Sequence, residues 1–145
     1  MENKRILAII FLILLLLLIF VPDLYNSYSV VEIKTIGVDF RVPKGLNVIG
    51  FNPDNDSLHL GRIPLNGVGK RNFSLFNDYD YALKVDIKST GNASPYIFLS
   101  DNNFILESNE TKDLRISAKP SLVPDTQPGN YSGELIIIFR KPLIS

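Results

Sequence analysis

The longest apolar stretch of the chain is Ile6–Val21, sixteen residues without a polar or charged side chain. A basic pair, Lys4 and Arg5, comes directly before it. A helix that is apolar on every side needs apolar cover all round, which a small β-domain cannot provide. As a helix, the stretch would rise about 24 Å, short of the roughly 30 Å of a hydrocarbon core. Leu24, with Tyr25 and Tyr28 at the depth of the membrane interface, makes up much of the difference. The pattern therefore predicts a transmembrane segment at residues 6–22.

The charges on either side of this segment predict its orientation. Basic residues lie in the head, residues 1–5, whereas acidic residues follow the segment. The positive-inside rule then places the N-terminus in the cytoplasm and residues 24–145 outside, beyond a polar connector at residues 23–29. An uncleaved signal anchor is favoured over a cleaved signal peptide, because only residues 27–29 offer small side chains for cleavage and they lie late.

The pattern changes to a period of two at residue 30, which is typical of half-buried β-strands. The clearest alternation is at residues 82–89, and the continuous apolar run at residues 135–139 predicts a central strand covered on both faces. Strands are predicted around residues 30–42, 46–51, 58–63, 72–76, 82–89, 96–99, 104–106, 114–118 and 131–140. Turns separate them every 8–12 residues, which predicts an all-β, antiparallel β-sandwich at residues 30–142, followed by a tail at 143–145.

The first strand contains a change of phase. Val31 and Ile33 share one face, but after Thr35 the apolar positions continue at Ile36 and Val38. A slip of one residue moves side chains to the opposite face, so we expect a β-bulge or a change of sheet near Thr35.

Composition narrows the chemistry. Fifteen basic and fifteen acidic residues give a formal charge of zero, which leaves no electrostatic footprint for nucleic acid. The absence of cysteine excludes disulfides, thiolate metal sites and cysteine nucleophiles. The one histidine, His59, lies between Leu58 and Leu60 and is predicted to face away from them, toward solvent or a sheet edge. We expect no metal, no cofactor and no catalysis.

Two pairs of acidic residues are candidate ligands for calcium. Asp54 with Asp56, and Asp78 with Asp80, lie in predicted loops. Calcium needs six to eight oxygen ligands, and ordinary turn chemistry explains both pairs. No feature of the sequence makes either pair a glycosidase site.

The sequence Asn-x-Ser/Thr occurs five times, all after the apolar segment, at Asn55, Asn72, Asn92, Asn109 and Asn130. These positions fall in predicted turns or on outward faces, where a glycan can be attached. Asn92 is the weakest, because a proline follows its serine. Alternatively, turns rich in Asn and Ser produce such sequences by composition alone. Attachment sites in a chain without cysteine fit an archaeal envelope.

Several segments resemble a known family: Leu58–Ile63, Arg71–Asn77, Leu106–Thr111, Leu114–Ile116 and Pro128–Leu135. Together they are similar to the immunoglobulin-like domains of the major-sperm-protein and ASH type found in prokaryotic membrane-anchored surface proteins. The resemblance covers residues 46–140. Leu60 and Ser108 depart from the family pattern, which usually has Phe and Pro there. The resemblance implies an immunoglobulin-like β-sandwich and no particular activity.

The matching residues have structural explanations. Gly61 and Gly133 suit positions where two backbones approach closely, and Gly129 turns the chain into the last strand. Tyr131 is either a tyrosine corner, with its hydroxyl on nearby backbone, or a plain core tyrosine.

Taken together, the sequence predicts a membrane-anchored, extracytoplasmic, non-catalytic module of the cell envelope. The expected partners are the bilayer, through residues 6–22, and envelope or surface-layer proteins or glycans. An accessory subunit of a surface machine, such as an archaellum stator, is the alternative within this architecture. An envelope hydrolase is the alternative of a different class, and the residue inventory argues against it.

Overall fold

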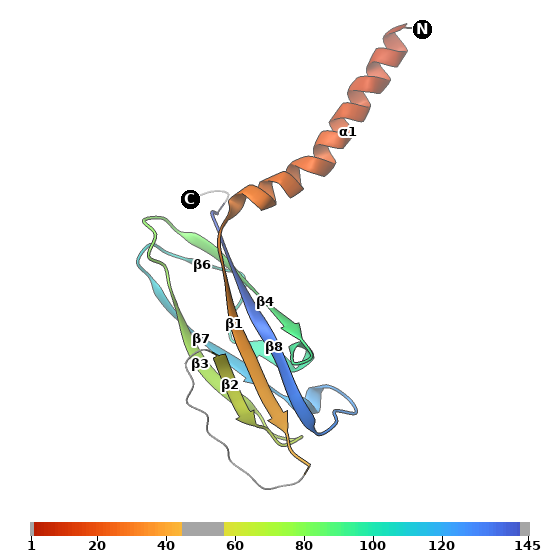
Figure 1. Cartoon of the computed structure of the whole chain (residues 1–145). Coiled ribbons are helices and arrows are strands. Elements are labelled where there is room, and N and C mark those ends of the chain that lie inside the picture. The colour runs from red at the N-terminus through yellow and green to blue at the C-terminus, as the bar shows by residue number, and fades with distance from the viewer. Residues whose placement is uncertain (1, 45–56, 143–145) are drawn as a thin grey trace. The chain divides into compact units, whose positions relative to one another are not determined.

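The computed structural model describes residues 2–44 and 57–142, and the chain divides into two compact units, Met1–Val30 and Val31–Ser145. Beyond one N-terminal helix and two short 3-10 turns, the described residues form an all-β fold (Figure 1). The predicted strand at residues 46–51, and the turn that holds Asn55 with Asp54 and Asp56, lie outside the described residues.

The N-terminal unit is the helix α1, Glu2–Ser29. It includes residues 2–5 and 23–29, which were predicted as head and connector. No glycine interrupts this stretch, and its one internal proline, Pro22, is the type of residue that bends a helix without ending it. Figure 1 shows α1 as a bent helix. The described side chains at residues 6, 7 and 9–20 are all exposed, and Leu16 is the least exposed at 44%.

Within the described part of the chain, no helix combines the length and the mean hydropathy needed to cross a membrane.

Eight strands make up the described β-structure. They are β1 (Val30–Val42), β2 (Ser57–Arg62), β3 (Gly69–Phe76), β4 (Leu83–Gly91), β5 (Ile97–Leu99), β6 (Phe104–Leu106), β7 (Thr111–Ala118) and β8 (Gly129–Arg140). The 3-10 turns η1 (Ser94–Tyr96) and η2 (Pro120–Leu122) follow β4 and β7. The predicted strands therefore all have counterparts wherever the chain is described.

The strands form two sheets. The first has the order β2-β1-β8-β4-β6, and the second has the order β3-β7-β5. Strand β8 lies in the middle of the first sheet, which confirms the central strand predicted from its apolar run. Most described pairs are antiparallel, but β2 runs parallel to β1. A parallel pair needs a connection of about a dozen residues or more. The chain between the end of β1 at Val42 and the start of β2 at Ser57 is long enough for this.

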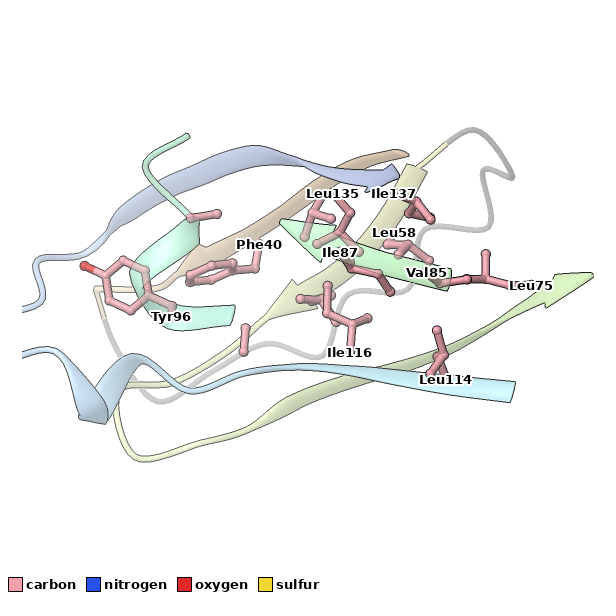
Figure 2. Close-up of a cluster of buried hydrophobic side chains, with 14 of the residues drawn as sticks. Phe40, Leu58, Leu75, Val85, Ile87, Tyr96, Leu114, Ile116, Leu135 and Ile137 are labelled. Carbon is pink, nitrogen blue, oxygen red and sulfur yellow. The ribbon is translucent and has the colours of Figure 1, made fainter. Parts of the chain in front are cut away.

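Alternating residues of both sheets contribute to one hydrophobic core. Val85, Ile87 and Ile137 come from the first sheet, and Leu114 and Ile116 from the second, and all belong to the same cluster (Figure 2). Each of these side chains is at most 3% exposed. The period of two in β4 and β7 thus has its expected physical origin, with one face of each strand in the core.

The change of phase expected in β1 agrees with its packing. Val31 and Ile36, five residues apart, both pack against the core, which an unbroken alternation would not allow. Ile33, expected on the face of Val31, is 57% exposed. A separate irregularity between Asp39 and Arg41 arises from β2, whose sequence adds a residue to the pairing.

Candidate functional site

The first sheet carries a groove with several charged and polar side chains on the face that points away from the core. Two adjoining hollows, of about 400 and 270 Å³, share Arg41, Arg62 and Asn130. The side chains that point outward into them come from three neighbouring strands, because alternate residues of a strand share a face. We call this surface the outer groove and define it by Asp39, Arg41, His59, Arg62, Asn130 and Ser132.

A bulge in β2 brings Arg62 to this face. His59 pairs with Asp39, and Arg62 pairs with Arg41. The step from His59 to Arg62 is three residues, whereas the step from Asp39 to Arg41 is two. The extra residue is Gly61, whose φ of 75° is a left-handed conformation that glycine adopts readily. The bulge reverses the alternation, so Arg62 is exposed and Ile63 is buried at 2%.

A chain of three polar side chains lies at one end of the groove. His59 Nδ1 is 2.5 Å from Asp39 Oδ2, and His59 Nε2 is 2.7 Å from Ser57 Oγ. A carboxylate can only accept, so Nδ1 carries a proton, and in a neutral imidazole Nε2 is then the acceptor. With a neutral ring, Ser57 Oγ donates to Nε2, and with a doubly protonated ring, Nε2 donates to Oγ. The order Ser–His–Asp is that of a serine-hydrolase triad.

Ser57 stands apart from the two hollows. Asp39 and His59 line the larger hollow, but Ser57 lines neither. A serine nucleophile needs space for the acyl group beside its oxygen, together with donors for the developing oxyanion. The contacts with Asp39 and Ser57 hold the His59 ring in one orientation at the groove wall.

His59 was predicted to face solvent or a sheet edge. It lies on β2, the edge strand of the first sheet, and its ring is only partly exposed. Its side chain is 18% exposed because Asp39 and Ser57 flank the ring. Its backbone carbonyl accepts a hydrogen bond of 3.3 Å from Arg71 Nη1. Neither ring partner of His59 was predicted from the sequence. Asp39 reaches His59 only through the parallel pairing of β1 with β2.

Arg41 and Arg62 form the positive part of the groove. They are partners in the register of β1 and β2, and both are exposed. Among the described residues, no acidic side chain forms an ion pair with either, whereas Arg140 pairs with Asp86 at 3.5 Å. Lys44 adds a third cation on the rim of the smaller hollow. A guanidinium presents a planar fork of donors, which matches a carboxylate or phosphate.

The four described glycosylation sequences all have exposed asparagines. Asn72 accepts a hydrogen bond of 3.1 Å from Arg115, and Asn92 accepts one of 2.7 Å from the backbone N–H of Ser132. Asn109 occupies a turn with φ of 58°. Only Asn130 lies in the outer groove.

Of the four family-pattern residues, Gly61, Gly129 and Tyr131 line the hollows and Gly133 does not. A Cβ on Gly133 would overlap the carbonyl oxygen of Thr90, so this glycine allows a close backbone approach. Gly61 instead supplies a left-handed residue. Gly129 opens β8, and no described atom lies within 4 Å of where its Cβ would be.

Tyr131 has the backbone partner that a tyrosine corner requires. Its hydroxyl donates a hydrogen bond of 2.7 Å to the carbonyl oxygen of Gln127, four residues upstream. Its ring stacks on Phe40 with centroids 5.0 Å apart and meets Tyr96 edge-on at 4.8 Å. Burial, together with the neighbouring Tyr96 hydroxyl, raises the pKa of Tyr131 above its usual value.

The acidic pair Asp78 and Asp80 forms no part of the groove. In residues 2–44 and 57–142, no group of three or more His, Asp or Glu side chains is placed to hold a metal ion. A different feature of the sequence points to the groove. The buried Leu60 and Ile63 are three residues apart instead of two, which marks the bulge at Gly61.

Compared with protein-family models, curated protein sequences and solved structures, the chain matches none of them.

Proposed function

We propose that this chain is a non-catalytic binding module of the cell envelope, anchored in the membrane by residues 6–22. Its β-domain lies outside the membrane and binds an envelope protein or glycan through the outer groove. The observation that carries the proposal is the pair Arg41 and Arg62, exposed side by side without acidic partners among the described residues. Two adjacent cations without an internal role suit recognition of an external group.

Two observations support the membrane anchor. The described side chains of α1 from residue 6 to residue 20 are large and apolar, and all are exposed. A contiguous exposed apolar surface of this kind requires cover from lipid or from another protein. Lys4 and Arg5 precede the apolar stretch, which supports a cytoplasmic N-terminus.

The fold that we propose for residues 30–142 is an immunoglobulin-like β-sandwich of the major-sperm-protein and ASH type. Its support is the single core to which both sheets contribute, together with the central position of the last strand. The backbone hydrogen bond of Tyr131 is also a feature of immunoglobulin-like domains. In such a domain the outer face of a sheet is free for binding.

A hydrolase is the second candidate, and one observation favours it: the order Ser57–His59–Asp39 with distances of 2.7 and 2.5 Å. The position of Ser57 outside both hollows argues for a binding role instead. The two candidates differ in the reactivity of Ser57, which a serine-directed covalent probe measures.

Affinity capture from native membranes tests the binding role. The full chain with a C-terminal tag, the double variant R41A/R62A and the control K84A would be compared by mass spectrometry of captured proteins and glycans. Lys84 is an exposed cation on β4, so K84A removes one positive charge elsewhere. We expect an envelope component that the wild type and K84A retain and R41A/R62A loses. Equal capture by all three chains would contradict binding through the groove.

The anchor has its own test. Extraction of native membranes with alkaline carbonate should leave the chain in the pellet, and external protease should digest residues 24–145 of intact cells stripped of their surface layer. Release into the supernatant would contradict the membrane anchor. Full protection from protease would contradict the proposed orientation.

A further inference from the structure

We propose that the outer groove binds an acidic sugar, with the carboxylate of a uronate between Arg41 and Arg62. This inference rests on the binding role proposed above and names the class of ligand. Three properties of the groove favour an acidic sugar: the arginine pair, the carboxylate beside it and the free amide opposite.

The arginine pair supplies the anion site. Arg41 and Arg62 are register partners on adjacent strands, so their Cα atoms lie about 5 Å apart. Both point away from the core and both line the two hollows. Two guanidinium forks at this spacing can hold one carboxylate from both sides with charge-assisted hydrogen bonds. A neutral ligand would leave both cations without a partner.

Asp39 favours a sugar over a dense polyanion. It lies two residues from Arg41 on the same strand face, a separation of about 7 Å, and its side chain is 45% exposed. A carboxylate has about four acceptor positions, and the contact with His59 uses only part of this capacity. The remaining positions can accept hydrogen bonds from sugar hydroxyls. Polyphosphate or a run of acidic side chains would be repelled there instead.

Asn130 completes the set of polar groups across the groove. Its exposed side-chain amide lines both hollows. It forms no hydrogen bond with the described residues, whereas the amides of Asn77 and Asn102 do. An amide both donates and accepts, as does a hydroxyl, so the pair is well matched. The hollow of about 400 Å³ lies within the range of small-ligand sites, about 300–1,000 Å³.

The test uses the full chain, produced without glycosylation and kept in a mild detergent. Tetragalacturonate would be titrated into it by calorimetry, and the same tetramer with its carboxylates methyl-esterified would serve as the matched ligand control. We expect saturable binding of the acid form and at least about tenfold weaker binding of the ester, the loss expected for one charge-assisted interaction.

Protein variants locate the site. R41A and R62A should each weaken binding of the acid about tenfold or more, and R62K should lie between R62A and the wild type because lysine lacks the planar fork. The control K84A should bind as the wild type does. Thermal unfolding curves of all variants should coincide, which would exclude loss of fold as the cause.

The possible outcomes separate this inference from the binding role. Equal affinity for acid and ester, no binding of either, or wild-type affinity in R41A/R62A would overturn the acidic-sugar assignment. If R41A/R62A nevertheless loses a captured protein from native membranes, the groove binds a protein and the binding role stands. Displacement of tetragalacturonate by inorganic phosphate at an equal concentration would also overturn the assignment, because the site would then select charge rather than a sugar acid.

Discussion

The side-chain amide of Asn77 donates a hydrogen bond of 3.0 Å to the carbonyl oxygen of Leu106 within the buried interior. The same amide also donates to the carbonyl oxygens of Tyr81 and Glu107, both at 2.9 Å, and its own oxygen accepts from the backbone N–H of Tyr79 at 3.1 Å. Asn77 is 1% exposed. One side chain therefore satisfies backbone groups of two segments at once, the turn at Tyr79–Tyr81 and the end of β6 at Leu106–Glu107.

Replacement of Asn77 by alanine should lower the free energy of unfolding by about 3 kcal/mol, because buried carbonyl groups and an N–H lose their only side-chain partner. Chemical denaturation monitored by fluorescence or circular dichroism would measure the change. Asn66, exposed in the loop before β3, provides the control N66A, for which we expect a change below about 0.5 kcal/mol. Similar losses in the two variants would mean that the hydrogen bonds of Asn77 are not what stabilises these loops.

Two glycines of β8 provide a matched pair. G133A should destabilise the fold by about 3 kcal/mol, because the new Cβ would overlap the carbonyl oxygen of Thr90 and push β4 and β8 apart. G129A has open space among the described atoms and should be neutral or stabilising by about 0.5 kcal/mol, since alanine restricts the unfolded chain. Midpoints of thermal unfolding for the two variants test the contrast, and a stable G133A would contradict the close approach.

Y131F should lower the free energy of unfolding by about 1 kcal/mol, the usual contribution of one hydrogen bond, because the ring stacking on Phe40 remains. Y81F is the control, since the Tyr81 hydroxyl forms no hydrogen bond with the described residues. A loss in Y81F equal to that in Y131F would assign the effect to hydroxyl removal in general.

The pH dependence of stability offers a second measurement on Tyr131. Its pKa is raised above the ordinary 10.0, chiefly by burial and also by the neighbouring Tyr96. The unfolded chain therefore loses this proton at lower pH than the folded chain does. The corresponding stability is fully present below the ordinary pKa and is lost as the pH rises through the raised one. Ultraviolet titration should show one tyrosine ionising late, and that late step should be missing from Y131F.

Ser57 should not behave as a catalytic nucleophile. Incubation of the full chain with a fluorophosphonate probe should label the wild type no more than S57A, because Ser57 lies outside both hollows. Stoichiometric labelling at Ser57 that disappears in H59A and in D39N would establish the hydrolase candidate in place of the binding module. Intact-mass spectrometry distinguishes the two results.

The parts of the fold that were predictable are those governed by local patterns. The alternation at residues 82–89 and the apolar run at residues 135–139 reflect which faces are buried, and a strand repeats that information every second residue. The exposure of Ile33 could not be predicted, because its side chain is apolar and yet 57% exposed. An isolated exposed apolar side chain is common and carries no warning in the sequence.

The groove depends on pairing between segments that are distant in sequence. Nothing local shows that β2 runs parallel to β1, so the contact of Asp39 with His59 and the alignment of Arg41 with Arg62 could not be derived. Gly61 was recognised as a special position for a related reason, close approach, but its role is to shift the alternation by one residue. The sequence marks Asn130 as a sugar-attachment position, but its place in the groove follows only from the order of the strands in the sheet.

The location of Asn130 makes two uses of the groove mutually exclusive. A glycan attached to this asparagine would fill the hollows that Arg41 and Arg62 line, and a ligand from outside could then not enter. Attachment is permanent once the chain has been made, so copies with and without it would form two lasting populations. They would share one fold, and only the bare copies would have an open groove.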